Sequence, residues 1–196
     1  MYAALITGSI RPDQVEQAID IYRERIVPMV RGWSGFRGLY VLTDRASGRG
    51  LIIALYETEE DARRVETSGQ FQQATAAFGE ALAGPPTREV REVIYHDQRG
   101  QARYARVTEA ALAPDQLAQV GNDTSMPEAA AQQPGYAGFL ITVDRAGGKL
   151  TGMSFWESQQ ALEASEQGYY QRTITESAGR FAGQPTRSVY EVAVQA

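Results

Sequence analysis

The sequence predicts an α+β protein made of two tandem copies of one structural unit. The first observation is a repeat, because residues 35–57, GFRGLYVLTDRASGRGLIIALYE, return one hundred positions later as residues 135–157, GYAGFLITVDRAGGKLTGMSFWE. Seven of the 23 aligned positions are identical. The second observation is that strand-like and helix-like segments follow the same order around both copies. A repeat of fixed period indicates duplication, so we expect two domains, at residues 1–97 and 102–196.

The composition excludes several classes of protein. With 43% apolar and 22% charged residues, it is that of a globular protein. No apolar run approaches the length of about 18 residues that a membrane span needs, so we expect no membrane partner. A net charge of -5 without clusters of Lys and Arg offers no surface for nucleic acid. The absence of cysteine excludes disulfides and thiolate metal sites, and the N-terminal residues do not resemble a secretory signal, so the expected location is cytoplasmic.

The first unit is expected to begin with a strand and a helix. Residues Tyr2–Thr7 are mostly apolar and rich in β-formers, which is typical of a buried strand. From Asp13 to Ile26, apolar residues recur at helical spacing, which predicts a helix with one face on a sheet. Pro28 and the run Arg31–Gly35 are expected to end this helix.

The repeated segment is expected to be a β-hairpin. In the first unit, a strand at Gly38–Thr43 and a turn at Asp44–Gly48 precede a return strand at Leu51–Tyr56. The return strand is apolar almost throughout, which indicates that both of its faces are covered. It should therefore be central in its sheet.

A second helix and a last strand complete the unit. Thr58 and Asp61 resemble a capping box, so a helix should start there, pause at Ser68 and Gly69, and resume as far as Leu82. A strand at Arg88–Tyr95 and a polar connector at His96–Gln101 follow. The order β-α-β-β-α-β is that of ferredoxin-like folds.

The second unit repeats this plan from Tyr104. Its residues Pro114–Gln116 match Pro12–Gln14, and Pro185–Arg187 match Pro86–Arg88. Its first helix should be short or irregular, because residues 121–126 interrupt the helical pattern before a proline.

Each half resembles an antibiotic biosynthesis monooxygenase (ABM) domain of the dimeric α+β barrel superfamily. The resemblance rests on a Gly-aromatic-x-Gly hairpin and on an aromatic residue, Glu and Thr or Ser at the start of the second helix. The residues concerned are Gly35, Phe36, Gly38, Tyr56, Glu57 and Thr58 in the first half, and Gly135, Tyr136, Gly138, Trp156, Glu157 and Ser158 in the second. The resemblance implies that the two antiparallel sheets pack into one barrel. We thus expect a monomeric pseudo-dimer, with further self-association left open.

The same resemblance implies three classes of function. The first is a cofactor-independent monooxygenase that oxidises a small aromatic or polyketide-like substrate. The second is a non-catalytic protein that binds a small apolar ligand, and the third is a structural or interaction protein without a working pocket. Whether the chain is an enzyme stays open, and no cofactor is expected.

Haem degradation, another activity in the superfamily, is disfavoured. It requires a histidine ligand on the second helix and an asparagine in the cleft. The ligand position falls near Thr75 in the first unit and Thr173 in the second. The chain has one histidine, His96, in the predicted connector, and one asparagine, Asn122, in the interrupted first helix of the second unit.

Other polar and aromatic residues have a functional and a structural interpretation. His96 could serve as a general base, although a histidine in a polar connector is more often exposed and without a role. The acidic run at residues 57–61 suits a helix start better than a cation site. Tyr169 and Tyr170 could line a pocket, but packing is favoured, and the matched residues Arg88 and Arg187 favour a structural contact common to both units. No spacing typical of metal ligands is present.

A candidate site follows from a difference between the units. Arg106 aligns with Ala4, while Gly152 and Ser154 align with Ile52 and Ala54. The second unit is thus more polar and roomier on strands expected to be central. A buried charge costs several kcal/mol unless an anion pairs with it. The candidate small-molecule site consists of Arg106, Tyr104, Thr142, Gly152, Ser154 and Trp156. The alternative is that Arg106 pairs with an acid such as Glu109 or Glu157, or extends to solvent.

Overall fold

The computed structural model describes residues 1–113, 115–117, 120–121 and 123–196. Two residues considered above, Pro114 and Asn122, lie outside the described residues. The described chain divides into two compact units. Unit 1 comprises Met1–Glu92 and Glu191–Ala196, and unit 2 comprises Val93–Tyr190.

The sheet of unit 1 is antiparallel, and its central strand is the one predicted from the sequence. Strand β3 (Arg49–Tyr56) pairs with β1 (Tyr2–Ser9) on one side and with β2 (Phe36–Thr43) on the other. The N-terminal part of β4 (Thr87–Gln98) adds to β1, and the C-terminal part of β8 (Thr186–Gln195) adds to β2. Both faces of β3 are covered, as its apolar sequence indicates.

The first helical segment of unit 1 extends further than expected. It consists of η1 (Pro12–Gln14), α1 (Val15–Ile21), a π-helical stretch η2 (Tyr22–Ile26) and α2 (Val27–Val30). Of the two predicted end signals, Pro28 does not end the helix, whereas the run Arg31–Gly35 directly follows its last residue, Val30. Proline lacks the N–H that an α-helix needs and its ring crowds the preceding turn, and the wider turn of the π-helical stretch lies directly before it.

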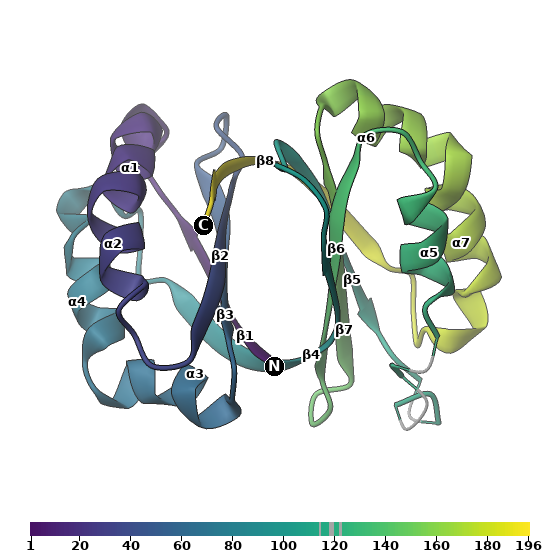
Figure 1. Cartoon of the computed structure of the whole chain (residues 1–196), viewed down its shortest axis with the longest axis horizontal. Helices are drawn as coiled ribbons and strands as arrows, with labels where there is room; N and C mark the ends of the chain where they lie inside the picture. The colour runs from purple at the N-terminus through teal and green to yellow at the C-terminus, as the bar shows by residue number, and fades with distance from the viewer. Residues whose placement is uncertain (114, 118–119, 122) are drawn as a thin grey trace. The chain divides into compact units, whose positions relative to one another are not determined.

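The second helical segment begins as predicted. Helix α3 (Glu59–Thr67) is capped by Thr58, whose Oγ1 accepts a hydrogen bond from the Asp61 N–H at 3.0 Å. Gly69, with φ of 80°, separates it from α4 (Gln70–Ala76). The helix stops at Ala76 rather than at Leu82, and only a short 3₁₀ turn, η3 (Gly79–Ala81), follows. Together these helices cover one face of the sheet (Figure 1).

The last strand of the first sequence half is longer than expected. Residues His96, Asp97 and Gln98 belong to β4, so the prediction of a connector beginning at His96 is wrong. Polar residues suggested a loop, but β4 continues into the sheet of unit 2, next to β6 (Tyr136–Asp144). Hydrogen bonds between the strands satisfy the backbone N–H and C=O groups there, whatever the side chains are.

Unit 2 repeats the arrangement. Strand β7 (Lys149–Trp156) lies between β5 (Tyr104–Ala111) and β6. Its helices are α5 (Ser125–Ala131), α6 (Gln159–Ser165), the π-helical η4 (Glu166–Tyr170), α7 (Gln171–Glu176) and the 3₁₀ turn η5 (Ala178–Arg180). Among the residues of unit 2 that the structure describes, the first helix is α5, and it is short, which agrees with the prediction of a short or irregular helix. The helices α5 to α7 cover one face of their sheet (Figure 1).

The predicted fold class is confirmed. Each unit is an α+β, ferredoxin-like body, and the hydrogen-bonded strand order, β1-β3-β2-β8-β5-β7-β6-β4, is that of a closed barrel. The compact units differ from the sequence halves at 1–97 and 102–196, because β4 and β8 each divide between the two units. Within the described residues, no helix is long and apolar enough to cross a membrane.

Candidate functional site

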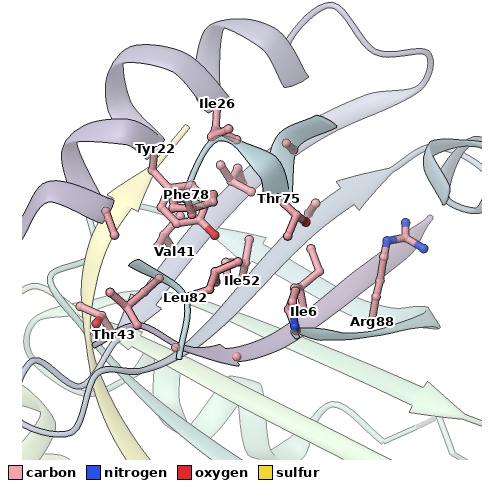
Figure 2. A pocket seen from close by; sticks show the side chains of 18 of the residues that line it. Ile6, Tyr22, Ile26, Val41, Thr43, Ile52, Thr75, Phe78, Leu82 and Arg88 are labelled. Atoms are coloured by element: carbon pink, nitrogen blue, oxygen red, sulfur yellow. The ribbon is translucent and has the colours of Figure 1, made fainter. Parts of the chain in front are cut away.

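Unit 1 contains an apolar cavity between its sheet and its helices. The cavity has a volume of about 100 Å³. Its floor is the helix-facing side of the sheet, with Leu39, Val41, Ile52 and Ala54. Because side chains alternate along a strand, these residues share one face and leave the others to the opposite side. Figure 2 shows the lining residues reaching the cavity from the sheet and from the helices above it.

Aromatic side chains form the helical wall of the cavity. Tyr22, from the π-helical stretch, packs against Phe78, with ring centroids 4.8 Å apart. Trp33 and Phe71 also line the cavity. In Figure 2 the Tyr22 side chain extends from its helix down toward the sheet, beside Phe78. A wall of this kind suits a flat apolar molecule.

Arg88 supplies the charged group of the cavity. Its side chain is only 3% exposed. Its Nη2 donates to the carbonyl oxygen of Ala62 at 2.5 Å, and its Nη1 lies 3.4 Å from Glu66 Oε2. The guanidinium carbon is 5.8 Å from the centre of the Phe71 ring. The Nε atom is buried and has no hydrogen-bond partner among the described residues.

Burial sets the protonation of the polar groups that line the cavity. It raises the pKa of Tyr22, and it raises the pKa of Tyr56 to about 12, an effect that Arg88 partly opposes. Burial also lowers the pKa of Arg88, with nearby Glu66 acting in the opposite direction. At neutral pH both phenols stay protonated and can donate hydrogen bonds. The lining residues, all of them described, include no Asp, Glu or His.

The predicted site residues in unit 2 mostly share one face of the sheet. Arg106 pairs across the strands with Ser154, and Tyr104 pairs with Trp156. Gly152 lies two residues from Ser154, on the same face. Five of the six candidates face the helices.

The structure contradicts the prediction for the sixth candidate, Thr142. It pairs with Thr151, whereas its neighbour Ile141 pairs with Gly152 and belongs to the cluster under the helices. Thr142 therefore points to the opposite face and cannot join Arg106. The prediction failed because the sequence could not establish which residues of β6 align with β7.

Arg106 is enclosed by protein groups of unit 2. Its side chain is 1% exposed, and its Nη2 donates to Leu162 O at 2.7 Å and Ser165 Oγ at 3.0 Å. The same nitrogen lies 3.1 Å from Glu166 Oε2, and the guanidinium carbon is 4.4 Å from the centre of the Tyr170 ring. This is the ion pair of the alternative interpretation, with Glu166 as the acid. Whether Arg106 also binds a ligand stays a prediction.

The remaining candidates have structural surroundings. Tyr169 and Tyr170 are buried in the core of unit 2, as the packing interpretation proposed. Arg88 and Arg187 pair with Glu66 and Glu166 at matching places in the two units. His96, expected to be exposed, is half-buried. Among the described residues, no group of acids and histidines could hold a metal ion.

Sequence reasoning missed the cavity of unit 1, because it placed the candidate site in the second unit. The signal was present in the same comparison that selected Arg106. Ala4 and Ala54 are the small counterparts of Arg106 and Ser154, so unit 1 has the smaller side chains where unit 2 has a long one. Thr75, near which the resemblance would place a haem ligand, lines this cavity, and its hydroxyl is no substitute for an imidazole.

Comparisons with known proteins agree with this architecture. Residues 1–77 match the model of the antibiotic biosynthesis monooxygenase family. An uncharacterized protein of Mycobacterium tuberculosis (strain H37Rv) is 26% identical over 171 residues, covering 83% of this chain and 74% of that protein.

Two solved structures are similar along almost the whole chain. A "putative monooxygenase" from Fusobacterium nucleatum has a TM-score of 0.79 at 13% identity, covering 99% of this chain and 93% of that one. An anthrone oxidase-like protein has a TM-score of 0.65 at 17% identity, covering 100% and 92%. At such identities the likeness shows the fold alone. Residues 1–77 thus match the ABM family, and the internal repeat and the strand order are consistent with a duplication of one structural unit.

Proposed function

We propose that the chain is an ABM-type, cofactor-independent monooxygenase that takes a small aromatic substrate into the cavity of unit 1. One observation carries the proposal. An apolar, aromatic-walled cavity, lined mostly by residues of the matched segment 1–77, also contains one buried guanidinium, that of Arg88, whose Nε has no hydrogen-bond partner among the described residues. A buried donor without a partner costs about 1–3 kcal/mol, and a phenolic oxygen would supply the acceptor.

The volume limits the size of the substrate. Ligand sites commonly measure about 300–1,000 Å³, whereas this cavity measures about 100 Å³. A single aromatic ring is therefore the largest flat molecule expected without rearrangement. A polycyclic, polyketide-like substrate would require Tyr22 and Phe78 to move apart.

The chemistry assigned to the site has the substrate as electron donor. A quinol whose ring carbon gains one oxygen atom from O₂ becomes a hydroxyquinone, and the second oxygen atom leaves as water. The quinol supplies all four electrons, so no other reductant is needed. Arg88 would favour the ionised quinol, which is the electron-rich form. The apolar wall would exclude water, and Tyr22 would donate a hydrogen bond to the second ring oxygen.

A second function, binding without catalysis, is favoured by a specific observation. The residues that line the cavity provide no carboxylate or imidazole to remove a proton. A binding protein needs no such group, whereas a monooxygenase of this kind depends on a substrate acidic enough to ionise beside Arg88.

The test is oxygen uptake with 1,4-hydroquinone under ¹⁸O₂. We expect uptake above the protein-free rate and one ¹⁸O atom in the hydroxyquinone. Water that adds to autoxidised quinone would bring only unlabelled oxygen. Ala74→Leu, which extends a side chain into the cavity from α4, should lower the rate at least about tenfold, equivalent to about 1.4 kcal/mol.

The matched control is Gln72→Leu, at an exposed position of the same helix. This variant should keep the wild-type rate. No labelled product with any variant, together with saturable binding of hydroquinone that Ala74→Leu abolishes, would establish the binding function instead. Equal rates for Ala74→Leu and wild type would show that the cavity is not the site.

A further inference from the structure

Arg106 and Arg88 make matching contacts from different strands. Each guanidinium donates to the carbonyl of the same helical position, Ala62 in unit 1 and Leu162 in unit 2. Each also lies next to the acid four residues further on, Glu66 or Glu166. Arg88 comes from β4, whereas Arg106 comes from β5, the counterpart of β1.

The residue of unit 2 that matches Arg88 in sequence is not the buried arginine of that unit. Arg187 matches Arg88 in sequence and also pairs with Glu166, but its side chain is 45% exposed, against 3% for Arg88. Two arginines of unit 2 thus share one acid, and Arg106 holds the buried place.

The Arg106 side chain lies beside residues whose counterparts in unit 1 line the cavity. Arg106 contacts Ser154 across the strands, Ser165 by a hydrogen bond, and the Trp156 ring at 5.9 Å. The counterparts of these three residues in unit 1 are Ala54, Val65 and Tyr56, and all three line the cavity. Ala4, the counterpart of Arg106, has only a methyl group at the matching position of β1.

We propose that Arg106 is an internal occupant of the ligand position in unit 2. The wild-type chain then binds one aromatic molecule, in unit 1, and replacing Arg106 by a small residue opens a second site for the same class of ligand, a single-ring phenol. In that variant Arg187, already paired with Glu166, is the guanidinium that corresponds to Arg88. The ligand class rests on the proposed function, whereas the occupation of the unit 2 position does not.

The experiment is a ¹⁹F NMR titration of the full chain with 4-fluorophenol. Wild type should give one bound resonance, and Arg106→Ala should give two. Ala74→Leu should remove the resonance of unit 1, so the double variant Ala74→Leu/Arg106→Ala should keep only the new one. Arg187→Ala, which removes an arginine from the same acid but leaves the occupant in place, is the matched control and should resemble wild type.

Other outcomes separate the two proposals. A bound resonance with Arg106→Ala but none with wild type would support the proposal that Arg106 occupies the ligand position of unit 2. The same result would contradict the proposed binding site in unit 1. A folded Arg106→Ala protein with one bound resonance or none would contradict the proposal that Arg106 occupies the ligand position of unit 2. Loss of the resonance seen with wild type would show that Arg106 itself binds the ligand.

A second variant covers the case in which Arg106→Ala does not fold. Ala4→Arg combined with Ile52→Gly transfers the long side chain of unit 2, and the space beside it, into unit 1. This variant should lose the wild-type resonance. Retention of the resonance would overturn the proposal.

Discussion

His96 lies on β4, and its Nε2 atom is buried without a hydrogen-bond partner among the described residues. Burial lowers the pKa of this imidazole, and the charge of Asp97 opposes the shift only in part. A charged ring would have to lose hydration without gaining an acceptor. The neutral form is therefore the one that the folded chain favours.

Stability should fall when the pH is lowered below the ordinary pKa of histidine. Because the folded pKa lies below the unfolded value of about 6.5, the unfolded chain binds more protons in this range. The contribution of His96 is present above about pH 6.5 and is lost as the pH falls toward the folded pKa. Urea unfolding midpoints at pH 7.5, 6.5 and 5.5 should decrease for wild type.

His96→Gln should remove this pH dependence. The chain has one histidine, so no other side chain of ordinary pKa titrates between pH 6 and 7. A parallel decrease in His96→Gln and wild type would assign the effect to other groups.

Single residues were predictable from the sequence only in part. The alignment of Arg106 with Ala4 correctly indicated a buried arginine near Ser154, because both residues lie on strands that were expected to be central in the sheet. The acidic residue that pairs with Arg106 could not be identified from the sequence. Glu166 lies sixty residues away in a π-helical stretch, and the sequence gives no sign of that wider turn. The room left by Gly152 and Ser154 was thus taken to hold a ligand.

Among the elements, the helix starts were the most predictable, because capping is local chemistry. In α3 the Thr58 hydroxyl accepts from the Asp61 N–H and donates to Asp61 Oδ2 at 2.5 Å, and Ser34 adds a 2.7 Å bond to the same carboxylate. In α6, Ser158 accepts from the Ala161 N–H at 3.1 Å. Ala161 stands at the position of Asp61 and has no carboxylate. The two caps differ by one acidic side chain.

Removing the cap should cost more in unit 1 than in unit 2. We expect Thr58→Ala to lower the free energy of unfolding by about 1–2 kcal/mol and Ser158→Ala by about 0.5–1 kcal/mol. The difference arises because Thr58→Ala also leaves Asp61 with one donor fewer. Urea titrations followed by circular dichroism measure both, and an equal or reversed order would contradict the role given to Asp61.

Element ends were less predictable than element starts. The first helix continues past Pro28, where the π-helical stretch accommodates the ring, and β4 continues past Tyr95. Both misjudgements have one physical cause. Proline and polar residues are local signals, whereas strand pairing and helix packing supply free energy from residues distant in the sequence.

At the scale of the whole molecule, the sequence repeat and the compact units do not coincide. The last six residues of the chain belong to unit 1, although 93–190 separate them from its other residues. Ala196 exchanges two main-chain hydrogen bonds with Leu39, at 2.7 and 2.9 Å, and Val194 is buried in the core of unit 1. Glu191 accepts from Arg45 Nε at 2.6 Å. Pattern analysis assigns these residues to the second half, because only pairing reveals their partners.

Deleting residues 191–196 should therefore damage unit 1 and spare unit 2. Two main-chain hydrogen bonds at about 1 kcal/mol each and the burial of Val194 at about 1.5–3 kcal/mol give an expected loss of about 3–5 kcal/mol. Hydrogen exchange read by mass spectrometry should show lost protection in β2, while β7 keeps its protection. Val189→Ser, at an exposed position of the same strand but in unit 2, should leave both strands protected. If β2 stayed protected in the truncated chain, the sheet of unit 1 would not depend on the C-terminal residues, and residues 1–97 would be expected to fold by themselves.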